Sequence, residues 1–148
     1  METVLIASDH AGFETKKQIK HVLEQQGYTI KDFGTFSEES MDYPDTVHPL
    51  AAEINAGNFR RGIILCGSGN GVNIVANKYP FVRSALCWTQ EIASLARKHN
   101  NANVVAVPAR FVDKETALEI VATFLHTDFE DGRHAQRVEK ITSGFIHN

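Results

Sequence analysis

Cysteine is scarce in this sequence: Cys66 and Cys87 are the only two among 148 residues. Two cysteines do not make a disulfide framework, and their low number favours a reducing, cytoplasmic location. Charge of one sign is also scarce, because the formal net charge is -3 and the pI is near 6.1. This balance offers no electrostatic attraction to nucleic acid or to an anionic membrane surface, so we expect neither as a partner.

Long hydrophobic runs, repeats and linkers are missing as well. No apolar stretch is long enough to span a bilayer, and residues 1–7 enter a strand pattern without the basic segment of a secretory leader. The length suits one domain with a real core, which we expect to cover residues 1–148. The seven histidines have no metal-ligand spacing and the two cysteines lie far apart, so no metal is expected.

What the sequence does contain is a regular alternation of apolar strand patterns and helical patterns. Predicted strands cover residues 4–7, 28–33, 63–65, 82–87 and 103–107, and residues 34–45 form a long polar connection. Predicted helices cover residues 13–26, 47–56, a segment starting near 72, 91–98, 114–125 and 133–145. This alternation predicts a three-layer, Rossmann-like α/β domain with a five-stranded parallel sheet, right-handed crossovers and a C-terminal helix.

A strand, a glycine turn and the start of a helix follow one another between residues 63 and 76. Cys66 ends the strand, and the turn after it reads Gly67-Ser68-Gly69-Asn70-Gly71. Such a turn lets a ligand approach the backbone, and its N–H groups favour negative charge. A thiol at this position should ionise more easily than a free cysteine. Taken alone, a cysteine at a strand end more often only packs there, so this interpretation stays open.

Two nucleotide-binding motifs do not fit this turn. A dinucleotide fingerprint would place G-x-G-x-x-G after the first strand, whereas the glycines here run G-x-G-x-G after the third. The turn also lacks the Gly-Lys-Ser/Thr sequence of a nucleoside triphosphate loop. The turn therefore indicates an anion cradle of another kind.

Polar side chains follow the first, third and fifth predicted strands. Ligands of parallel sheets bind beyond the carboxyl ends of the strands, which would bring Asp9, His10, the Cys66 turn and Arg110 together. Asp9 could instead cap the helix that follows it, and His10 could be an ordinary surface histidine. From the spacing alone, both interpretations stay open.

Two further groups of polar residues lie near helix ends. Arg133 and Arg137 are one helical turn apart at the start of the last predicted helix, where two guanidinium groups can converge on a phosphate. The alternative is a solvated helix face. Asn100 and Asn101 follow another predicted helix, where asparagine also serves as a C-terminal cap.

Six motifs together resemble type B ribose-5-phosphate isomerases, and they cover essentially the whole chain in order. They are Ser8-Asp9-His10-Ala11-Gly12, Asp42-Tyr43-Pro44, Cys66-Gly67-Ser68-Gly69-Asn70-Gly71, Ala76-Asn77-Lys78, Arg97-Lys98-His99-Asn100 and Gly132-Arg133-His134-x-x-Arg137-Val138. The glycine turn alone would be weak support, whereas the full set is specific. Ser68 stands where many members of the family have threonine, and the hydroxyl is kept.

The resemblance implies an isomerase that interconverts ribose 5-phosphate and ribulose 5-phosphate in the pentose phosphate pathway, through an enediolate and without a cofactor. It implies Cys66 as the base, Ser68 as a proton carrier and His99 as the group that opens the sugar ring. The implied substrate-binding residues are Asp9, His10, Gly67, Gly69, Asn70, Gly71, Asn100, Arg110, Arg133 and Arg137. His10, Arg133 and Arg137 would hold the phosphate with Arg110 near them.

The resemblance also implies a homodimer, or a dimer of such dimers, with the site at the interface. The neighbouring subunit would supply His99, Asn100 and Arg110. Two alternatives stay open from the sequence. One is an isomerase of a six-carbon phosphosugar, either allose 6-phosphate or galactose 6-phosphate. The other is a non-catalytic sugar-phosphate-binding module, against which Cys66, Ser68 and His99 argue because binding alone needs none of them.

Overall fold

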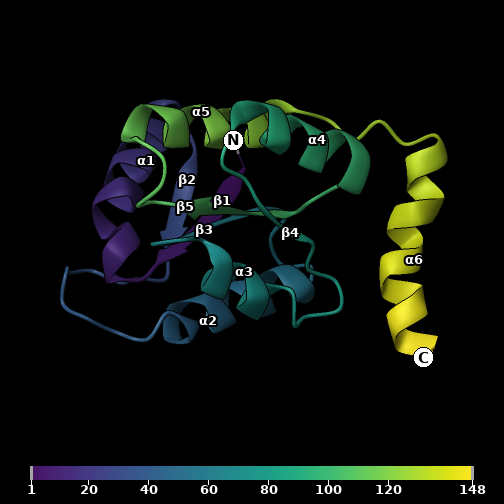
Figure 1. The fold of residues 1–148 in the computed structure, drawn as a ribbon, viewed down its shortest axis with the longest axis horizontal. Coiled ribbons are helices and arrows are strands. Elements are labelled where there is room, and N and C mark those ends of the chain that lie inside the picture. The colour runs from purple at the N-terminus through teal and green to yellow at the C-terminus, as the bar shows by residue number, and fades with distance from the viewer. Residues whose placement is uncertain (1, 148) are drawn as a thin grey trace.

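The computed structural model describes residues 2–147 of the chain. Its centre is a sheet of five parallel strands in the order β2-β1-β3-β5-β4 (Figure 1). The strands are β1 (Thr3–Ser8), β2 (Thr29–Asp32), β3 (Gly62–Cys66), β4 (Ser84–Leu86) and β5 (Val104–Pro108). Each overlaps a segment whose sequence predicts a strand, so the predicted five-stranded parallel sheet is confirmed.

Helices cover both faces of this sheet, as the alternating pattern predicts (Figure 1). One face carries α1 (Phe13–Gln25), α4 (Gln90–Asn100) and α5 (Lys114–His126), and the other carries α2 (Pro44–Asn55) and α3 (Asn70–Ala76). A short 3-10 turn, η1 (His10–Gly12), joins β1 to α1. The three-layer architecture is therefore confirmed. Among the described residues, no helix is both long and apolar enough to cross a membrane.

The core follows from the two-residue period of the central strands. In β3, Ile63 and Leu65 are fully buried in the layer of α1, α4 and α5, whereas Ile64 and Cys66 pack into the layer of α2 and α3. A strand with apolar residues on both faces reads as an uninterrupted apolar run, which explains why the sequence predicts it so clearly.

The direction in which successive strands are added to the sheet reverses between β1 and β3. The connection from β1 leads outward to β2, and β3 then starts on the other side of β1, with Ser8 in register with Leu65. Two neighbouring strands whose connections diverge leave a crevice beyond their carboxyl ends, where ligands of such sheets bind. Asp9 and Cys66 lie at this point of the sheet.

Helix α2 and strand β4 differ from their predicted ranges in ways that have a clear physical reason. Helix α2 begins at Pro44, because proline has a helical φ and needs no acceptor for an N–H in the first turn, so the helix includes the end of the predicted connection 34–45. Strand β4 is shorter than residues 82–87, and it is an edge strand. At this edge, Oδ1 of Asn77 accepts a hydrogen bond from the N–H of Ser84 at 2.8 Å, and Nδ2 of Asn77 donates one to the carbonyl of Ser84 at 2.9 Å. The Asn77 side chain thus takes the hydrogen-bonding place of a further strand.

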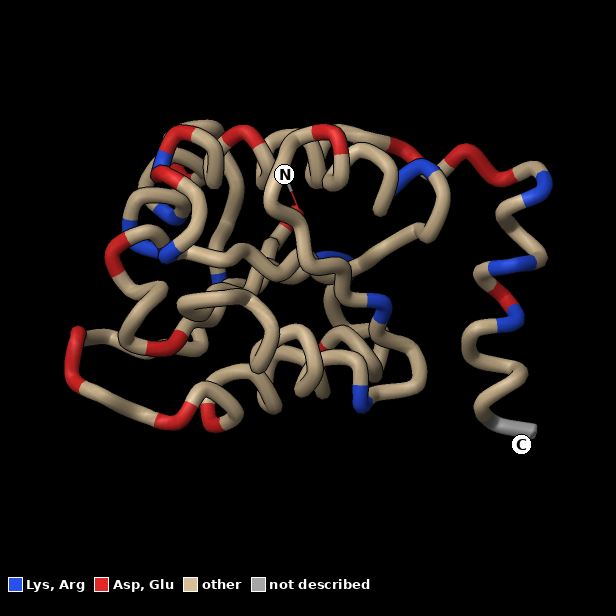
Figure 2. The backbone as a smooth tube through the Cα atoms, viewed as in Figure 1, with Lys and Arg blue, Asp and Glu red and all other residues tan. Residues whose placement is uncertain are grey.

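Helix α6 (Arg133–His147) stands apart from the three layers, at the right in Figure 1. It contacts the rest of the chain mainly through α4, and the Thr142 hydroxyl donates a hydrogen bond to the carbonyl of Pro80 at 2.8 Å. Basic residues recur along α6, whereas acidic residues gather on the connection between β2 and α2 (Figure 2). The last helix is thus present as predicted, but it lies outside the sandwich.

Candidate active site

Cys66 ends β3 at the rim of a cleft on the carboxyl edge of the sheet. The residue is 6% exposed, so the thiol is accessible only from this cleft. The cleft has a volume of about 480 Å³. We call it the cysteine cleft, and it is lined by Asp9, Tyr43, Cys66, Gly67, Ser68, Gly71, Arg110 and Phe111.

The turn that follows Cys66 depends on glycine at position 69. The φ angle of Gly69 is +77°, in the left-handed region that residues with a Cβ rarely adopt. A Cβ there would also lie 2.5 Å from the Leu86 side chain and 3.3 Å from the backbone nitrogen of Pro108. Neither β4 nor β5 can give way easily, so the path of the turn is fixed by its neighbours.

Two side chains lie over the other glycines of the turn and form walls of the cleft. A Cβ on Gly67 would lie 3.2 Å from Cδ of Arg110, and a Cβ on Gly71 would lie 2.5 Å from Cζ of Tyr43. The missing side chains therefore make room for an arginine on one side and an aromatic ring on the other. The cleft owes its shape to these two contacts.

The floor of the cleft offers hydrogen-bond donors. Within residues 2–147, the backbone N–H groups of Gly67, Ser68 and Gly69 have no protein acceptor. The Ser68 hydroxyl is exposed, and its oxygen accepts a hydrogen bond from the N–H of Asn70 at 3.2 Å. Unpaired N–H groups beside a thiol can stabilise an oxyanion that develops on a bound substrate.

Asp9 and His10 occupy the turn after β1. The Asp9 carboxylate accepts a hydrogen bond from the N–H of Gly12 at 3.0 Å and so caps η1, whereas the N-cap of the predicted helix, α1, is Gly12. Asp9 also lines the cleft. His10 lies just outside the lining, and its Nδ1 accepts a hydrogen bond from the N–H of Met41 at 3.3 Å. A neutral imidazole with an accepting Nδ1 carries its proton on Nε2.

Arg110 lies in the cysteine cleft of its own chain. Its N–H donates to the carbonyl of Gly67 at 3.0 Å, and the N–H of Ala109 donates to the carbonyl of Cys66 at 2.9 Å. The resemblance groups Arg110 with His99 and Asn100 as residues of a neighbouring subunit. The structure instead places Arg110 with Cys66, because β5 pairs directly with β3 and the turn after β5 folds over the turn after β3.

A second surface, on α4 and α6, holds other predicted residues. It contains a pocket of about 380 Å³, and no residue lines both this pocket and the cysteine cleft. We call it the histidine face, and it is lined by His99, Asn100, His134, Arg137, Val138 and Ile141. Figure 1 shows α6 on the opposite side of the molecule from the start of α1, which follows the end of β1. Within one chain, the residues of the cysteine cleft and those of the histidine face therefore do not form a single site.

His99 has two partners on this face. Its Nε2 lies 3.5 Å from a carboxylate oxygen of Glu130, which forms an ion pair when the imidazole is protonated. Its ring stacks on His134, with centroids 4.3 Å apart and planes inclined by 18°. The N–H of Glu130 donates to the carbonyl of Lys98 at 3.1 Å, which ties the segment before α6 to α4. These contacts orient a histidine whose side chain is 39% exposed.

Arg133 and Arg137 are exposed on the same side of the first turns of α6, as their spacing predicts.

Partial desolvation, and then the charges of His99, Arg133 and Arg137, lower the pKa of His134. His134 is therefore harder to protonate than a free imidazole. Asn101 ends α4 with φ +46°, which confirms the C-terminal cap that the sequence allowed at this position.

Cys87, the second cysteine, has a different environment. It is fully buried after β4, and its thiol donates a weak hydrogen bond to the carbonyl of Ala85 at 3.6 Å. Burial raises the pKa of the Cys87 thiol to about 12. Cys87 is thus a packing residue, and both cysteines are free thiols.

The sequence assigns no catalytic or binding role to several residues of these surfaces: Tyr43 and Phe111 in the cysteine cleft, and Glu130, His134, Val138 and Ile141 on the histidine face. Tyr43 and His134 stand in motifs that carry the resemblance, and this is the signal that could have found them. The contact of Tyr43 with Gly71 gives no local signal, because it joins segments that are far apart in the sequence. In the part of the chain that the structure describes, no three His, Cys, Asp or Glu side chains are grouped as metal ligands.

The profile of the Ribose/Galactose Isomerase family matches residues 4–141, so the chain belongs to this family of isomerases. The resemblance to type B ribose-5-phosphate isomerases is confirmed. Ribose-5-phosphate isomerase B of Escherichia coli is 39% identical over 143 residues, covering 97% of this chain and 96% of that protein. The D-erythrulose-4-phosphate isomerase of Pectobacterium atrosepticum is 42% identical over 142 residues, with 95% and 93% covered.

Solved structures agree with the sequence comparison. A ribose 5-phosphate isomerase from Thermotoga maritima superposes with a TM-score of 0.93 at 46% identity, covering 96% of this chain and 98% of that one. Ribose-5-phosphate isomerase B from Mycoplasma genitalium, solved with bound ribulose 5-phosphate, gives 0.94 at 36% identity, with 99% and 97% covered. The likeness therefore extends over the whole fold, including α6.

Proposed function

We propose that the chain interconverts D-ribose 5-phosphate and D-ribulose 5-phosphate as an aldose–ketose isomerase of the pentose phosphate pathway. The observation that carries this proposal is a thiol at the end of β3 beside unpaired backbone N–H groups, in a chain that matches ribose-5-phosphate isomerases over nearly its whole length. The two free thiols, Cys66 and Cys87, suit a reducing cytoplasm as its location.

Isomerisation moves a proton between C2 and C1 of the open-chain sugar. The Cys66 thiolate removes the proton from C2 of the aldose, and the electron pair moves through a C1–C2 double bond onto the oxygen of C1. The N–H groups of Gly67, Ser68 and Gly69 stabilise the enediolate, since they have no other protein acceptor within residues 2–147. The Ser68 hydroxyl carries a proton between the two oxygens, and the Cys66 thiol returns its proton to C1.

The remaining steps require groups of the histidine face. Ribose 5-phosphate is mainly a closed furanose, so its ring must open before the C2 proton can be removed. His99, oriented by Glu130 and His134, exchanges protons with the ring oxygen and the anomeric hydroxyl in this step. Asn100 binds a sugar oxygen beside it. Because this face lies away from Cys66 in one chain, a second copy must bring it to the cysteine cleft.

The phosphate has anchors on both surfaces. Arg133 and Arg137 offer two guanidinium groups from α6, and Arg110 lies over Gly67 in the cleft. The Nε2–H of His10 is free to donate, because the N–H of Met41 occupies Nδ1. Asp9 lines the cleft between these anchors and Cys66, where its carboxylate accepts hydrogen bonds from sugar hydroxyls, and Asn70 and Gly71 complete the binding turn.

Mixing two impaired variants, assayed at a ribose 5-phosphate concentration far below the KM of Arg137→Ala so that neither variant alone turns over appreciably, tests the two-copy site. In a two-fold dimer of Cys66→Ala with Arg137→Ala subunits, one site carries both defects and the other carries none. Random reassociation of equal amounts should therefore restore about a quarter of the wild-type turnover. A mixture that stays inactive, although mass spectrometry detects mixed dimers, would mean that one chain supplies the whole site.

A matched mixture tests the position of Arg110. Cys66→Ala and Arg110→Ala alter the same cleft, so every site of their mixed dimer has one defect and no activity should return. Recovery in this mixture would assign Arg110 to the partner's site. The subunits should be separated and reassociated under the same conditions in both mixtures, so that the two results are comparable.

A four-carbon substrate is the rival that the comparisons favour, since the erythrulose-4-phosphate isomerase is as similar in sequence as the ribose-5-phosphate isomerases. The two substrates make different demands on His99. Erythrose 4-phosphate cannot close a furanose ring, because its C4 oxygen carries the phosphate. Turnover of ribose 5-phosphate, erythrulose 4-phosphate, allose 6-phosphate and galactose 6-phosphate, measured with a chelator, decides among them. We expect ribose 5-phosphate to have the highest kcat/KM, and a higher value for another sugar would refute the proposal.

A further inference from the structure

Four arginines surround a pocket at the edge of the sheet opposite the cysteine cleft. The pocket has a volume of about 330 Å³. Its polar lining consists of Arg60, Arg61, Arg83, Arg97, Asn101 and Asn103. Arg61 directly precedes β3 and Arg83 directly precedes β4, so these side chains lie at the amino ends of strands whose carboxyl ends face the proposed active site. We call this group the arginine pocket.

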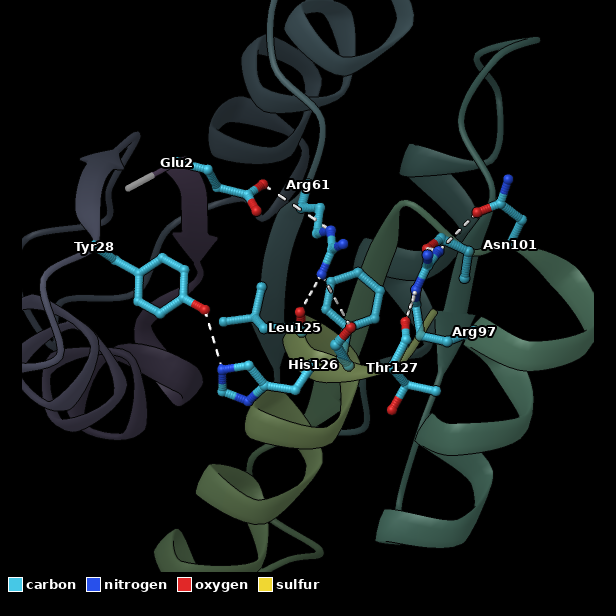
Figure 3. Close-up of polar contacts among 10 residues, drawn as sticks. Glu2, Tyr28, Arg61, Arg97, Asn101, Leu125, His126 and Thr127 are labelled. Carbon is cyan, nitrogen blue, oxygen red and sulfur yellow. Dashed lines mark hydrogen bonds and ion pairs between the residues drawn. The ribbon is translucent and has the colours of Figure 1, made fainter. Parts of the chain in front are cut away.

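Two of these arginines are buried and bonded to backbone carbonyls (Figure 3). Arg61 is 8% exposed and donates to the carbonyls of Phe124 and Leu125 at the end of α5. Arg97 is 6% exposed and donates to the carbonyl of Thr127 at 3.0 Å and to the side-chain oxygen of Asn101 at 2.9 Å. These acceptors are neutral, so the bonds fix the guanidinium groups without cancelling their charge.

Few carboxylates pair with these arginines among the described residues. Glu2 lies 4.0 Å from Nε of Arg61, and Asp128 acts on Arg97 from a greater distance. Arg60 and Arg83 form no ion pair within residues 2–147, so the pocket keeps positive charge. Burial, and then the neighbouring Arg61 and Arg83, lower the pKa of Arg97, as expected where like charges gather away from water.

Donors in the pocket also remain unused. Among the described residues, neither terminal nitrogen of the Arg83 guanidinium group has an acceptor. The one hydrogen bond of this side chain runs from Nε to the carbonyl of Asn101 at 2.9 Å. Arg60 is exposed and donates no hydrogen bond to the described residues. A purely structural role explains Arg61 and Arg97, which hold helix ends, but it leaves the charge and the donors of Arg60 and Arg83 without a counterpart.

We infer that the arginine pocket binds a phosphate group, either as inorganic phosphate or as the phosphate of a small monoester. A phosphate dianion would pair with Arg60 and Arg83, which have no ion pair within residues 2–147, and forked guanidinium donors match its oxygens in geometry. Asn103 and Asn101 line the same pocket, and their amides can bind a further oxygen. The arginine pocket lies at the opposite edge of the sheet from Cys66 and shares no lining residue with the cysteine cleft or with the histidine face, so it is distinct from both parts of the proposed substrate site.

The experiment titrates inorganic phosphate into the Arg137→Ala variant, which weakens the phosphate site proposed for the substrate. Side-chain Nε–H signals of Arg83 and Arg97 in NMR spectra should shift and saturate, and sodium chloride at equal ionic strength should not reproduce this. Adding Arg60→Ala should weaken phosphate binding about ten- to a hundredfold, the value of one charge-assisted bond. Adding Lys114→Ala, which removes an exposed charge outside the pocket, should change nothing.

Arg83→Gln serves as the second variant, and its far-ultraviolet spectrum should match that of the parent. Equal phosphate affinity with and without Arg60→Ala and Arg83→Gln would overturn the inference, as would signals of Arg83 and Arg97 that do not move. Competition between methyl phosphate and inorganic phosphate distinguishes a monoester from the free ion. In the Arg137 wild-type background, Arg60→Ala should leave turnover without added phosphate unchanged. Failure of the isomerase proposal would therefore not alter the binding result.

Discussion

The cysteine cleft and the histidine face differ mainly in how they are supported. The cleft rests on the ends of β1, β3 and β5, where the N–H of Asp9 donates to the carbonyl of Leu65 at 3.2 Å and that of Ala109 to Cys66 at 2.9 Å. The histidine face rests on α4 and on a helix that stands outside the sandwich. The sheet fixes one surface, whereas the other is set by side-chain contacts between two helices and by a backbone bond from Glu130 to Lys98.

This difference matches the demands of the reaction. Proton transfer at carbon needs a base placed within a fraction of an ångström, and a sheet edge with backbone bonds provides that precision. Phosphate binding and proton exchange at a ring oxygen act through longer and more adaptable side chains. We therefore expect changes in the cleft to abolish chemistry, and changes on the face to alter ring opening and binding.

The largest effect is expected for Cys66→Ala. Loss of the base should lower kcat by about two to four orders of magnitude, while ribose 5-phosphate still binds in a calorimetric titration. The matched control is Cys87→Ala, which removes a buried thiol with no access to the cleft and should cost roughly 1 kcal/mol of stability at near-normal turnover. Wild-type turnover in Cys66→Ala would reduce Cys66 to a packing residue as well.

The next effect is expected for His99→Asn and depends on direction. The variant can use only ribose 5-phosphate that has opened without help, so its forward rate should stop rising with enzyme concentration once spontaneous opening limits it. The reverse rate, from ribulose 5-phosphate, should stay proportional to enzyme because this ketose forms no furanose. Coupled assays over a wide range of enzyme concentrations measure both. Proportionality in both directions would argue against ring opening by His99.

Arg137→Ala should raise KM for ribose 5-phosphate by roughly one to two orders of magnitude, the value of one charge-assisted bond. Some loss should appear in kcat, because phosphate binding also positions C1 and C2. Arg137→Lys should recover only part of the loss, since lysine lacks the planar fork. Weak activity on free ribose should be unaffected by Arg137→Ala, and an equal loss there would make Arg137 a structural residue.

Alanine substitutions at two glycines with positive φ compare how tightly the backbone is held in the cysteine cleft and before α6. Gly69→Ala in the cleft combines left-handed backbone strain with a Cβ that would lie 2.5 Å from the Leu86 side chain. Gly132→Ala, just before α6, has the same kind of strain at φ +55°, but its Cβ would meet only the carbonyl oxygen of Glu130, at 4.0 Å. Gly132→Ala should cost roughly 1–2 kcal/mol from backbone strain alone, and Gly69→Ala should cost more. Denaturant unfolding measures both. Equal costs would show that the turn after Cys66 is no more constrained than the start of α6.

The smallest effect is a pH dependence on the histidine face. Because partial desolvation and nearby charges lower the pKa of His134, protonation is harder in the folded than in the unfolded protein. Stability should therefore be greatest above the ordinary value of 6.5 and fall as the pH drops through the lower folded value. His134→Asn should flatten this slope slightly in unfolding curves at several pH values. An unchanged slope would mean that solvent screens the cluster completely.

Much of the fold could be predicted because the central strands β1, β3 and β5 are short apolar runs with a turn behind each of them. The apolar run at Ile63 to Leu65 and the glycines after Cys66 identify the central strand and the turn without reference to the rest of the chain. The start of α2 was missed, because Pro44 reads as a residue of the polar connection and acts as a helix start only in its context. Local sequence patterns therefore predict that a helix or strand is present better than they predict where it begins or ends.

The site was harder to predict, because its residues meet through strand order and packing. Strand-end position correctly suggested that Asp9 and Arg110 share a rim with Cys66, since that argument depends only on a parallel sheet. The separation of Arg137 from that rim depends on the path of residues 127–132 and on where α6 lies, which no spacing in the sequence encodes. His99 lies near the end of α4, which leads back to the amino end of β5, so its separation from the rim follows from the order of the elements. The contact of Tyr43 with Gly71 is likewise a product of packing.

That contact has an evolutionary consequence. A side chain at position 71 and the ring at position 43 compete for the same space, so the two positions should change together during divergence of the family. A lineage that gains a larger residue at 71 must first lose the ring at 43, and the reverse order would pass through a strained intermediate. Since Tyr43 is a wall of the cysteine cleft, this pair is also a place where the length of an accepted sugar can drift without any change in the catalytic groups.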